Sequence, residues 1–118
     1  MEFEIEKYPN KEKCRLVSVD SSFVVNVADL ARITEICNQP PVHKSLEAIV
    51  GNNPYTVGDA RGFIEWAKDG WLSEKWYVFL VRDSNNKILA CVDIKVGKDS
   101  DMGGREIGFW ADTENPGV

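Results

Sequence analysis

The stretch that decides the fold lies at residues 76–96 and reads WYVFLVRDSNNKILACVDIKV. Its first part, residues 76–82, is rich in aromatic and β-branched side chains, which favour a strand. The polar cluster Asp83-Ser84-Asn85-Asn86 is typical of a hairpin connection, and residues 88–96 return as a second strand. One face of the returning strand is apolar throughout, whereas the other begins apolar and becomes charged at Asp93. Both faces are therefore partly covered, which predicts a sheet with helices packed on it.

The first of two predicted helices precedes this hairpin and covers residues 27–37. Asn26 is its expected cap, with Asp29 three residues further on. Its expected apolar face comprises Val27, Leu30, Ala31, Thr34 and Cys37, with Ile33 on the flank. The two prolines of residues 38–41 end this helix, because proline lacks a backbone N–H and disfavours helical angles in the residue before it. A loop is expected from there to the second helix.

The second predicted helix has the clearest start in the chain. Thr56 is placed to cap it, and Asp59 stands at the third helical position, where a capping box needs an acidic side chain. Its apolar stripe comprises Val57, Ala60, Phe63, Ile64, Ala67 and Trp71. Trp66 lies well off that stripe, so it is a candidate for lining a site, for flanking a broad core face or for contacting another chain.

The two ends of the chain supply the remaining strands. Residues 1–13 form a charged leader whose alternation is compatible with a short strand, and residues 14–19 predict a strand of their own. The last strand is predicted at residues 105–111. The fold class is therefore α+β, with two helices packed on a mostly antiparallel sheet, and residues 14–118 are taken as one domain.

Composition argues against several classes of function. The formal net charge of -5, without any run of Lys or Arg, argues against binding to nucleic acid or to a membrane surface. The first seven residues are charged and carry no apolar core, so they do not resemble a signal peptide. Three cysteines without CxxC spacing predict free thiols in a reducing compartment, and the protein is expected in the cytoplasm. No spacing typical of metal ligands is present in the sequence.

Three short motifs resemble one branch of a known enzyme family. Asn38-Gln39-Pro40-Pro41-Val42 resembles the Asn-Asp-Pro-x-Val stretch of the ribosomal-protein-alanine acetyltransferases, a branch of the GNAT superfamily of N-acetyltransferases. Pro54-Tyr55-Thr56, followed by Asp59-Ala60 and Phe63-Ile64, resembles the start of the second helix in that branch. Glu106-Ile107-Gly108-Phe109-Trp110-Ala111-Asp112 resembles its fourth-strand signature, Glu-Ile-Gly-Tyr-Trp-Leu-Asp. The resemblance implies the amino-terminal part of a GNAT fold.

One departure from the family concerns the last residues. In the family, the fourth strand runs into a Gln/Arg-x-x-Gly-x-Gly/Ala loop whose backbone N–H groups cradle the coenzyme's pyrophosphate at a helix start. Asn115-Pro116-Gly117-Val118 does not match that loop, and a later tyrosine that often serves as general acid is also absent. We therefore expect either a fragment of a longer protein or a degenerate cofactor loop. The expected sheet is incomplete at its carboxyl end, and the chain alone is expected to be inactive.

The resemblance implies acetyl transfer from acetyl-CoA to a primary amine. This reaction needs a deprotonated amine, a polarised thioester carbonyl and a protonated leaving thiolate. By resemblance, the backbone around Phe109, Trp110 and Ala111 would bind the acetyl-CoA thioester and polarise its carbonyl. Glu106, which shares a strand face with Trp110, is the first candidate for the general base, and Asp93 is the second. For both carboxylates the alternative is an ordinary solvated strand residue.

The resemblance also indicates where an acceptor would bind. Tyr55 and Trp66 are candidates for the acceptor pocket, because the connection between the helices and the second helix shape that pocket in the family. His43, the single histidine, either lines the acceptor site or is an ordinary loop residue. The cysteines are expected to be small buried hydrophobic residues.

Partners and competing functions follow from the same features. The expected partners are a primary-amine acceptor, either a protein amino terminus or a small molecule, and further copies of the chain. A homo-oligomer is expected to form through residues 105–111, because the family's next strand is missing and an open strand edge is a template for pairing. The alternative to an enzyme is a degenerate GNAT-like module that binds a protein or a small ligand. A third alternative is an unrelated small α+β domain.

Overall fold

The computed structural model describes residues 1–7, 12–96 and 105–114, without the side chains of Glu6, Lys7, Glu12, Arg105 and Glu106. Within these ranges five strands form one sheet in the order β1-β2-β3-β4-β5, and each neighbouring pair is antiparallel. The strands are β1 (Glu2–Lys7), β2 (Glu12–Ser18), β3 (Trp76–Arg82), β4 (Ile88–Val96) and β5 (Arg105–Ala111). The predicted hairpin is therefore confirmed as β3 and β4.

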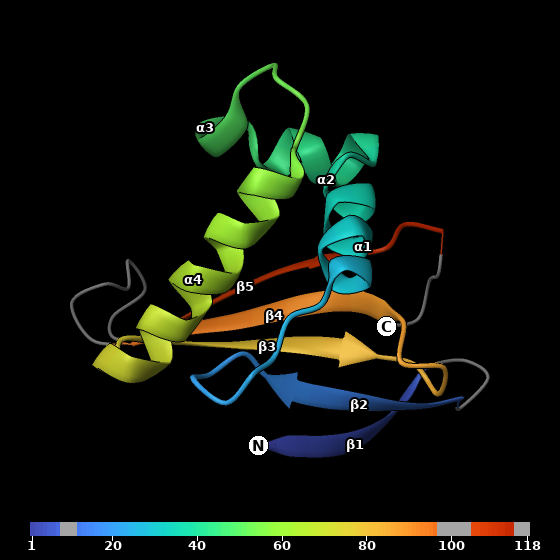
Figure 1. Ribbon diagram of the computed structural model, residues 1–118, viewed down its shortest axis with the longest axis vertical. Helices are drawn as coiled ribbons and strands as arrows, with labels where there is room; N and C mark the ends of the chain where they lie inside the picture. Colours follow the sequence, from blue (N-terminus) through green and yellow to red (C-terminus); the bar gives the residue numbers. More distant parts are fainter. Residues whose placement is uncertain (8–11, 97–104, 115–118) are drawn as a thin grey trace.

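The helices of the described chain gather on one face of this sheet (Figure 1). They are α1 (Val27–Cys37), α2 (Pro40–Ser45), α3 (Glu47–Val50) and α4 (Val57–Ser73). Both α1 and α4 begin with the predicted capping boxes, in which Asn26 and Thr56 accept a hydrogen bond from the backbone N–H three residues on. The predicted α+β fold, with two long helices on an antiparallel sheet, is confirmed.

The prediction of a loop after α1 is wrong, because two short helices, α2 and α3, lie between α1 and α4. Pro40 and Pro41 take the first helical positions of α2. There the missing N–H of proline has no intrahelical role, and its fixed φ angle suits a helix start. The same prolines that end α1 therefore begin the next helix.

The buried face of α1 also differs from the expected one. Leu30, Ile33 and Ile36 are buried, whereas Val27 is 79% exposed. Cys37 is buried as expected, and Ala31 is exposed. Spacings of three and four residues fit both faces, and the branched side chains of the isoleucines bury more apolar surface than alanine or threonine would. Packing against α4 and the sheet therefore favours the isoleucine face.

A break in the strand alternation shapes β4. The register between β3 and β4 shifts at Val81 and Arg82. As a result Ile88 packs in the core beneath the helices together with Cys91, whereas Leu89 and Ala90 pack in a second cluster. The uniformly apolar face expected for β4 is therefore divided between the two sides of the sheet.

The side of the sheet opposite the helices is apolar and partly open. Figure 1 shows no helix on that side among the described residues. Phe3 on β1 is 49% exposed, and Ile107 and Phe109 on β5 are 65% and 71% exposed. None of the helices in the described ranges combines the length and the apolar composition that a membrane-spanning segment requires.

Candidate functional site

A cavity of about 640 Å³ lies where the first half of α4 faces β4 and β5. Residues of α2 and α3, at their junction, complete its wall. Its volume and its mostly apolar lining, with a few polar groups, are typical of small-molecule sites. The aromatic and charged residues of the wall are Tyr55, Phe63, Trp66, Phe109, Trp110, Asp59, Asp93 and Lys95.

Stacked aromatic rings form one wall of the cavity. Trp66 stacks on Trp76 with the ring centroids 5.3 Å apart, and Phe63 lies between Trp66 and Trp110 at 6.2 and 5.8 Å. The Trp76 indole donates a hydrogen bond of 2.8 Å to the Trp66 carbonyl oxygen. Gly70 leaves room for this indole, because a Cβ at that position would lie 2.0 Å from the Trp76 ring. Trp66 is therefore held by packing and does not project freely into solvent.

Asp93 brings a carboxylate into the cavity from β4. It pairs across the strands with Gly108, where a Cβ would lie only 2.7 Å from Asp93 Oδ1. The missing side chain at Gly108 thus makes room for the carboxylate. Asp93 Oδ2 is buried and accepts no hydrogen bond from any group in the described part of the chain. The nearest cation recorded for it is the Lys95 ammonium, 3.6 Å from Oδ2.

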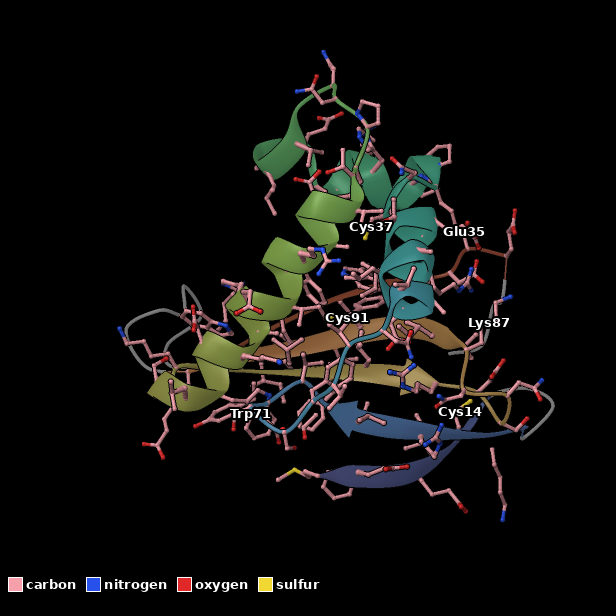
Figure 2. All side chains as sticks on the ribbon, in the orientation of Figure 1. Cys14, Glu35, Cys37, Trp71, Lys87 and Cys91 are labelled. Carbon is pink, nitrogen blue, oxygen red and sulfur yellow. The ribbon has the colours of Figure 1, made fainter. Side chains whose placement is uncertain are left out.

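Three buried groups in and behind the cavity wall are neutral at physiological pH. Burial raises the pKa of the Cys37 thiol to about 12 and raises those of the Tyr55 hydroxyl and the Cys91 thiol well above their ordinary values. Figure 2 shows Cys37 between α1 and α4, with Cys91 on β4 below it. The Asn38 side chain fixes the Tyr55 backbone through two hydrogen bonds of 2.8 Å. Tyr55 therefore contributes shape to the wall, and neither thiol is activated as a nucleophile.

The strand β5 offers backbone groups along its outer side. The Asp112 N–H donates to the Leu89 carbonyl oxygen at 2.8 Å, so this residue faces β4. Because successive residues of a strand alternate, the N–H of Trp110 also faces β4, and those of Phe109 and Ala111 face away. Within the described sheet β5 is one of the two edge strands, and β1 is the other. Either of the two outward N–H groups can therefore donate to a bound carbonyl.

The structure brings some of the predicted site residues together and leaves others apart. Tyr55, Trp66 and Trp110 meet at the cavity. His43 instead lines a separate, open hollow of about 450 Å³, and its Nε2–H donates to the Asn53 carbonyl oxygen at 2.7 Å. The backbone of Glu106 pairs with Lys95 across β4 and β5, but its side chain is outside the described residues.

Lys95 and Gly108 are site residues that sequence reasoning missed. Gly108 lies beside Asp93 because of the pairing register of β4 with β5, which joins residues 15 positions apart, whereas Lys95 follows Asp93 on the same face of β4. The available signal was the charged end of the β4 face, where Asp93 and Lys95 are two residues apart. No group of His, Cys, Asp and Glu residues that could hold a metal ion occurs in the described part of the chain.

Two solved structures share this fold over nearly the whole chain. A proposed ribosomal-protein-serine acetyltransferase from Vibrio cholerae superposes with a TM-score of 0.60 at 15% identity, over 95% of this chain and 56% of that one. RimJ from Mycobacterium smegmatis, solved in complex with CoA-disulfide, superposes with a TM-score of 0.66 at 14% identity, over 98% of this chain and 53% of that one. No protein-family profile and no curated protein sequence matches the chain.

These likenesses define the class of fold. One of the two structures is described as a ribosomal-protein-serine acetyltransferase, and the likeness to both structures is a likeness of fold. The chain has a partial GNAT fold, as the sequence resemblance predicted. It spans about half the length of each of the two structures.

Proposed function

We propose that this chain is part of an N-acetyltransferase that transfers the acetyl group of acetyl-CoA to a primary amine. The observation that carries the proposal is the cavity, which contains the buried carboxylate of Asp93 and is bordered by β5. RimJ, which shares the fold, was solved with a CoA derivative, and this supports a CoA-type ligand. The acceptor amine belongs either to a protein amino terminus or to a small molecule.

In the proposed reaction, acetyl-CoA supplies an activated acetyl group. The neutral amine nitrogen forms a bond to the acetyl carbon, and the bond from that carbon to sulfur breaks. The nitrogen then releases a proton, which the leaving sulfur takes up as it departs as a thiol. One of the outward N–H groups, that of Phe109 or that of Ala111, donates to the carbonyl oxygen, where negative charge develops, as in an oxyanion hole. Trp110, between them, packs against Phe63 and walls the acceptor side of the strand. The aromatic wall excludes water from the reacting atoms.

The amine must lose a proton before it attacks. A lysine-type amine has a pKa of about 10.4 and an α-amine about 7.7 to 8.0, so the acceptor arrives largely as an ammonium ion at neutral pH. We propose Glu106 as the base that takes this proton, since its backbone lies on β5 opposite Lys95 at the edge of the cavity. Loss of a general base lowers a rate about 10²-fold or more.

We also propose that the 118-residue chain does not transfer acetyl groups by itself. Most of the charge of acetyl-CoA is on its phosphates, and residues 115–118 do not match the loop that cradles them in the family. The net charge of -5 provides no surplus of positive charge in its place. Calorimetry should show no binding of acetyl-CoA to this chain tighter than about 1 mM.

The function is tested on the protein translated from the complete reading frame that contains these residues. Acetyl-CoA is mixed with this protein and a panel of primary amines, comprising alkylamines and peptides with free amino termini, and the released thiol is measured. Thiol release that requires both protein and amine supports the proposal. A folded complete protein that releases no thiol with any amine would contradict it and favour a non-catalytic binding module.

A further inference from the structure

The cavity contains an internal ion pair that the proposed acetyl transfer does not use. We propose that the Asp93 carboxylate and the face of Trp66 form an ammonium-binding subsite, which Lys95 of the same chain fills until a ligand displaces it. The ligand class is a primary ammonium ion on an apolar or aromatic stem. The identification of this ligand as the acceptor rests on the proposed function, whereas the binding of an ammonium ion does not.

The Asp93 carboxylate has unused capacity for a cation. Its side chain is 14% exposed, and Oδ2 accepts no hydrogen bond within the described chain. The Lys95 ammonium is 3.6 Å away, beyond the distance of a charge-assisted hydrogen bond, about 2.7 to 2.9 Å. A carboxylate that is desolvated and incompletely paired is costly, so a cation that approaches more closely gains free energy at this position.

Trp66 supplies the second half of the subsite. The Lys95 ammonium lies over its ring, 5.9 Å from the centroid, near the outer limit of a cation–π interaction. The ring itself is held by its stack with Trp76. A ring fixed in this way presents its face to a ligand without an entropic penalty for ordering it.

Lys95 is suited to leave the subsite. Its side chain is 32% exposed, and its ammonium group ends a flexible four-carbon stem. The ammonium can therefore turn into solvent, where it is well hydrated. An entering ammonium would then replace Lys95 beside Asp93. The Asp93 carboxylate and the Trp66 ring would stay in place, and only the cation bound between them would be exchanged.

The charges around the cavity select for a cation. Among the described residues, the charged side chains of its wall are Asp59, Asp93 and Lys95. Asp59 stays in the capping box, where its Oδ2 accepts hydrogen bonds from the backbone and hydroxyl groups of Thr56 at 2.8 and 3.0 Å. When Lys95 leaves, this part of the wall carries two carboxylates and no cation. The remaining wall includes Leu46 and Phe63, which fit an apolar stem.

The test measures binding of three six-carbon probes to the 118-residue chain by calorimetry. The probes are hexylammonium, hexanol and hexanoate, which share a stem and differ in charge. Hexylammonium should bind at least about tenfold more tightly than the other two, because only it gains both the ion pair and the cation–π interaction. Equal binding of hexanol, or tighter binding of hexanoate, would overturn the proposal.

Variants distinguish ammonium binding at the subsite from non-specific apolar binding in the cavity. Lys95→Met keeps a long stem but removes the competing ammonium, so it should tighten hexylammonium binding several-fold. Asp93→Asn should weaken it about tenfold or more. The matched control is Lys44→Met, because Lys44 lines the separate hollow and its loss should leave binding unchanged. Weaker or unchanged binding in Lys95→Met would overturn the proposal even if the Asp93 variant fails to fold.

The outcomes also distinguish this inference from the proposed function. Selective ammonium binding without thiol release in the complete protein would retain the subsite and reject the acetyltransferase. If the complete protein releases thiol but the three probes bind equally well whatever their charge, the subsite is rejected and the acetyltransferase is retained.

Discussion

The side-chain amide of Gln39 donates a hydrogen bond of 2.8 Å to Asp112 Oδ1, and so joins the start of α2 to the end of β5. The Oε1 atom of the same side chain accepts hydrogen bonds from the Thr113 backbone N–H and hydroxyl at 2.8 and 2.9 Å. Arg32 of α1 pairs with the other carboxylate oxygen of Asp112. These contacts fix the direction in which the chain leaves β5. They also bring together the two motifs that begin and end the family resemblance.

The Asp112 network should make stability depend on pH in the acid range. Burial by itself raises the pKa of Asp112, but hydrogen bonds from Gln39 and from the Glu114 backbone, together with Arg32, outweigh it, so the folded pKa lies below the ordinary value of 3.8. Ionised Asp112 therefore contributes stability above pH 3.8, and this contribution is lost as the pH falls through the folded pKa.

Gln39→Ala tests this contribution by removing one of the groups that lower the pKa. Urea unfolding measured from about pH 6 down to pH 2.5 should show a shallower loss of stability in this variant than in the wild type. The control is Glu35→Gln, which alters only an exposed partner of Arg32 and should keep the wild-type slope. Identical slopes for all three proteins would show that Gln39 does not lower the pKa of Asp112 in the folded state.

Two glycines of α4 should respond oppositely to alanine. At Gly62 an added Cβ meets no atom within 4 Å, so Gly62→Ala should stabilise the protein by about 0.5 to 1 kcal/mol through helix propensity. At Gly70 the Cβ would lie 2.0 Å from the Trp76 ring, so Gly70→Ala should destabilise by about 1 to 3 kcal/mol or more through overpacking. Denaturant midpoints measure both effects. A gain in stability at Gly70 would mean that the indole is not packed there.

Kinetics of the complete protein should separate a base from an anchor. Glu106→Gln removes the proposed base, so it should lower kcat about 10²-fold or more with little change in the KM for the amine. Asp93→Asn removes the proposed ammonium anchor, so it should mainly raise that KM. Rates measured from pH 6 to 9 provide the check on Glu106. An unchanged profile in Glu106→Gln would assign this carboxylate to solvent.

The 118-residue chain should associate with itself at high concentration. β5 is an edge strand of the described sheet, and it exposes Ile107 and Phe109 on the helix-free side. Such an edge is a template for pairing with another chain. Sedimentation should show concentration-dependent oligomers, and Phe109→Lys should reduce them, because charge on an edge strand opposes pairing. A wild-type monomer at every concentration would contradict the expectation.

Local signals allowed the sequence to predict much of this fold. The two capping boxes and the β3–β4 turn each depend on residues within a few positions of one another, so they can be recognised without the tertiary structure. The isoleucine face of α1 could not be chosen in this way, because it depends on how the helix packs against α4 and the sheet. The shift at Val81 and Arg82 likewise reflects strand pairing that no local pattern shows.

The candidate site was less predictable than the fold. The sequence predicted Trp66 as a candidate for the acceptor pocket and Asp93 as the second candidate for the general base. It did not show that both would contact Lys95. That meeting depends on the side chains that hold Trp66 in place and on the register that sets Gly108 beside Asp93. Both relationships join residues that are ten or more positions apart in the sequence. Only the tertiary structure brings them together.

All three cysteines of this chain are buried, and burial keeps Cys37 and Cys91 in the thiol form. A maleimide attacks thiolates that it can reach, so the folded chain offers it few targets. A cysteine introduced at an exposed position such as Val24 or Leu72, which are 84% and 80% exposed, would react far faster than the native thiols. A fluorophore or spin label can therefore be attached at a chosen point of the surface while all three native cysteines remain in place.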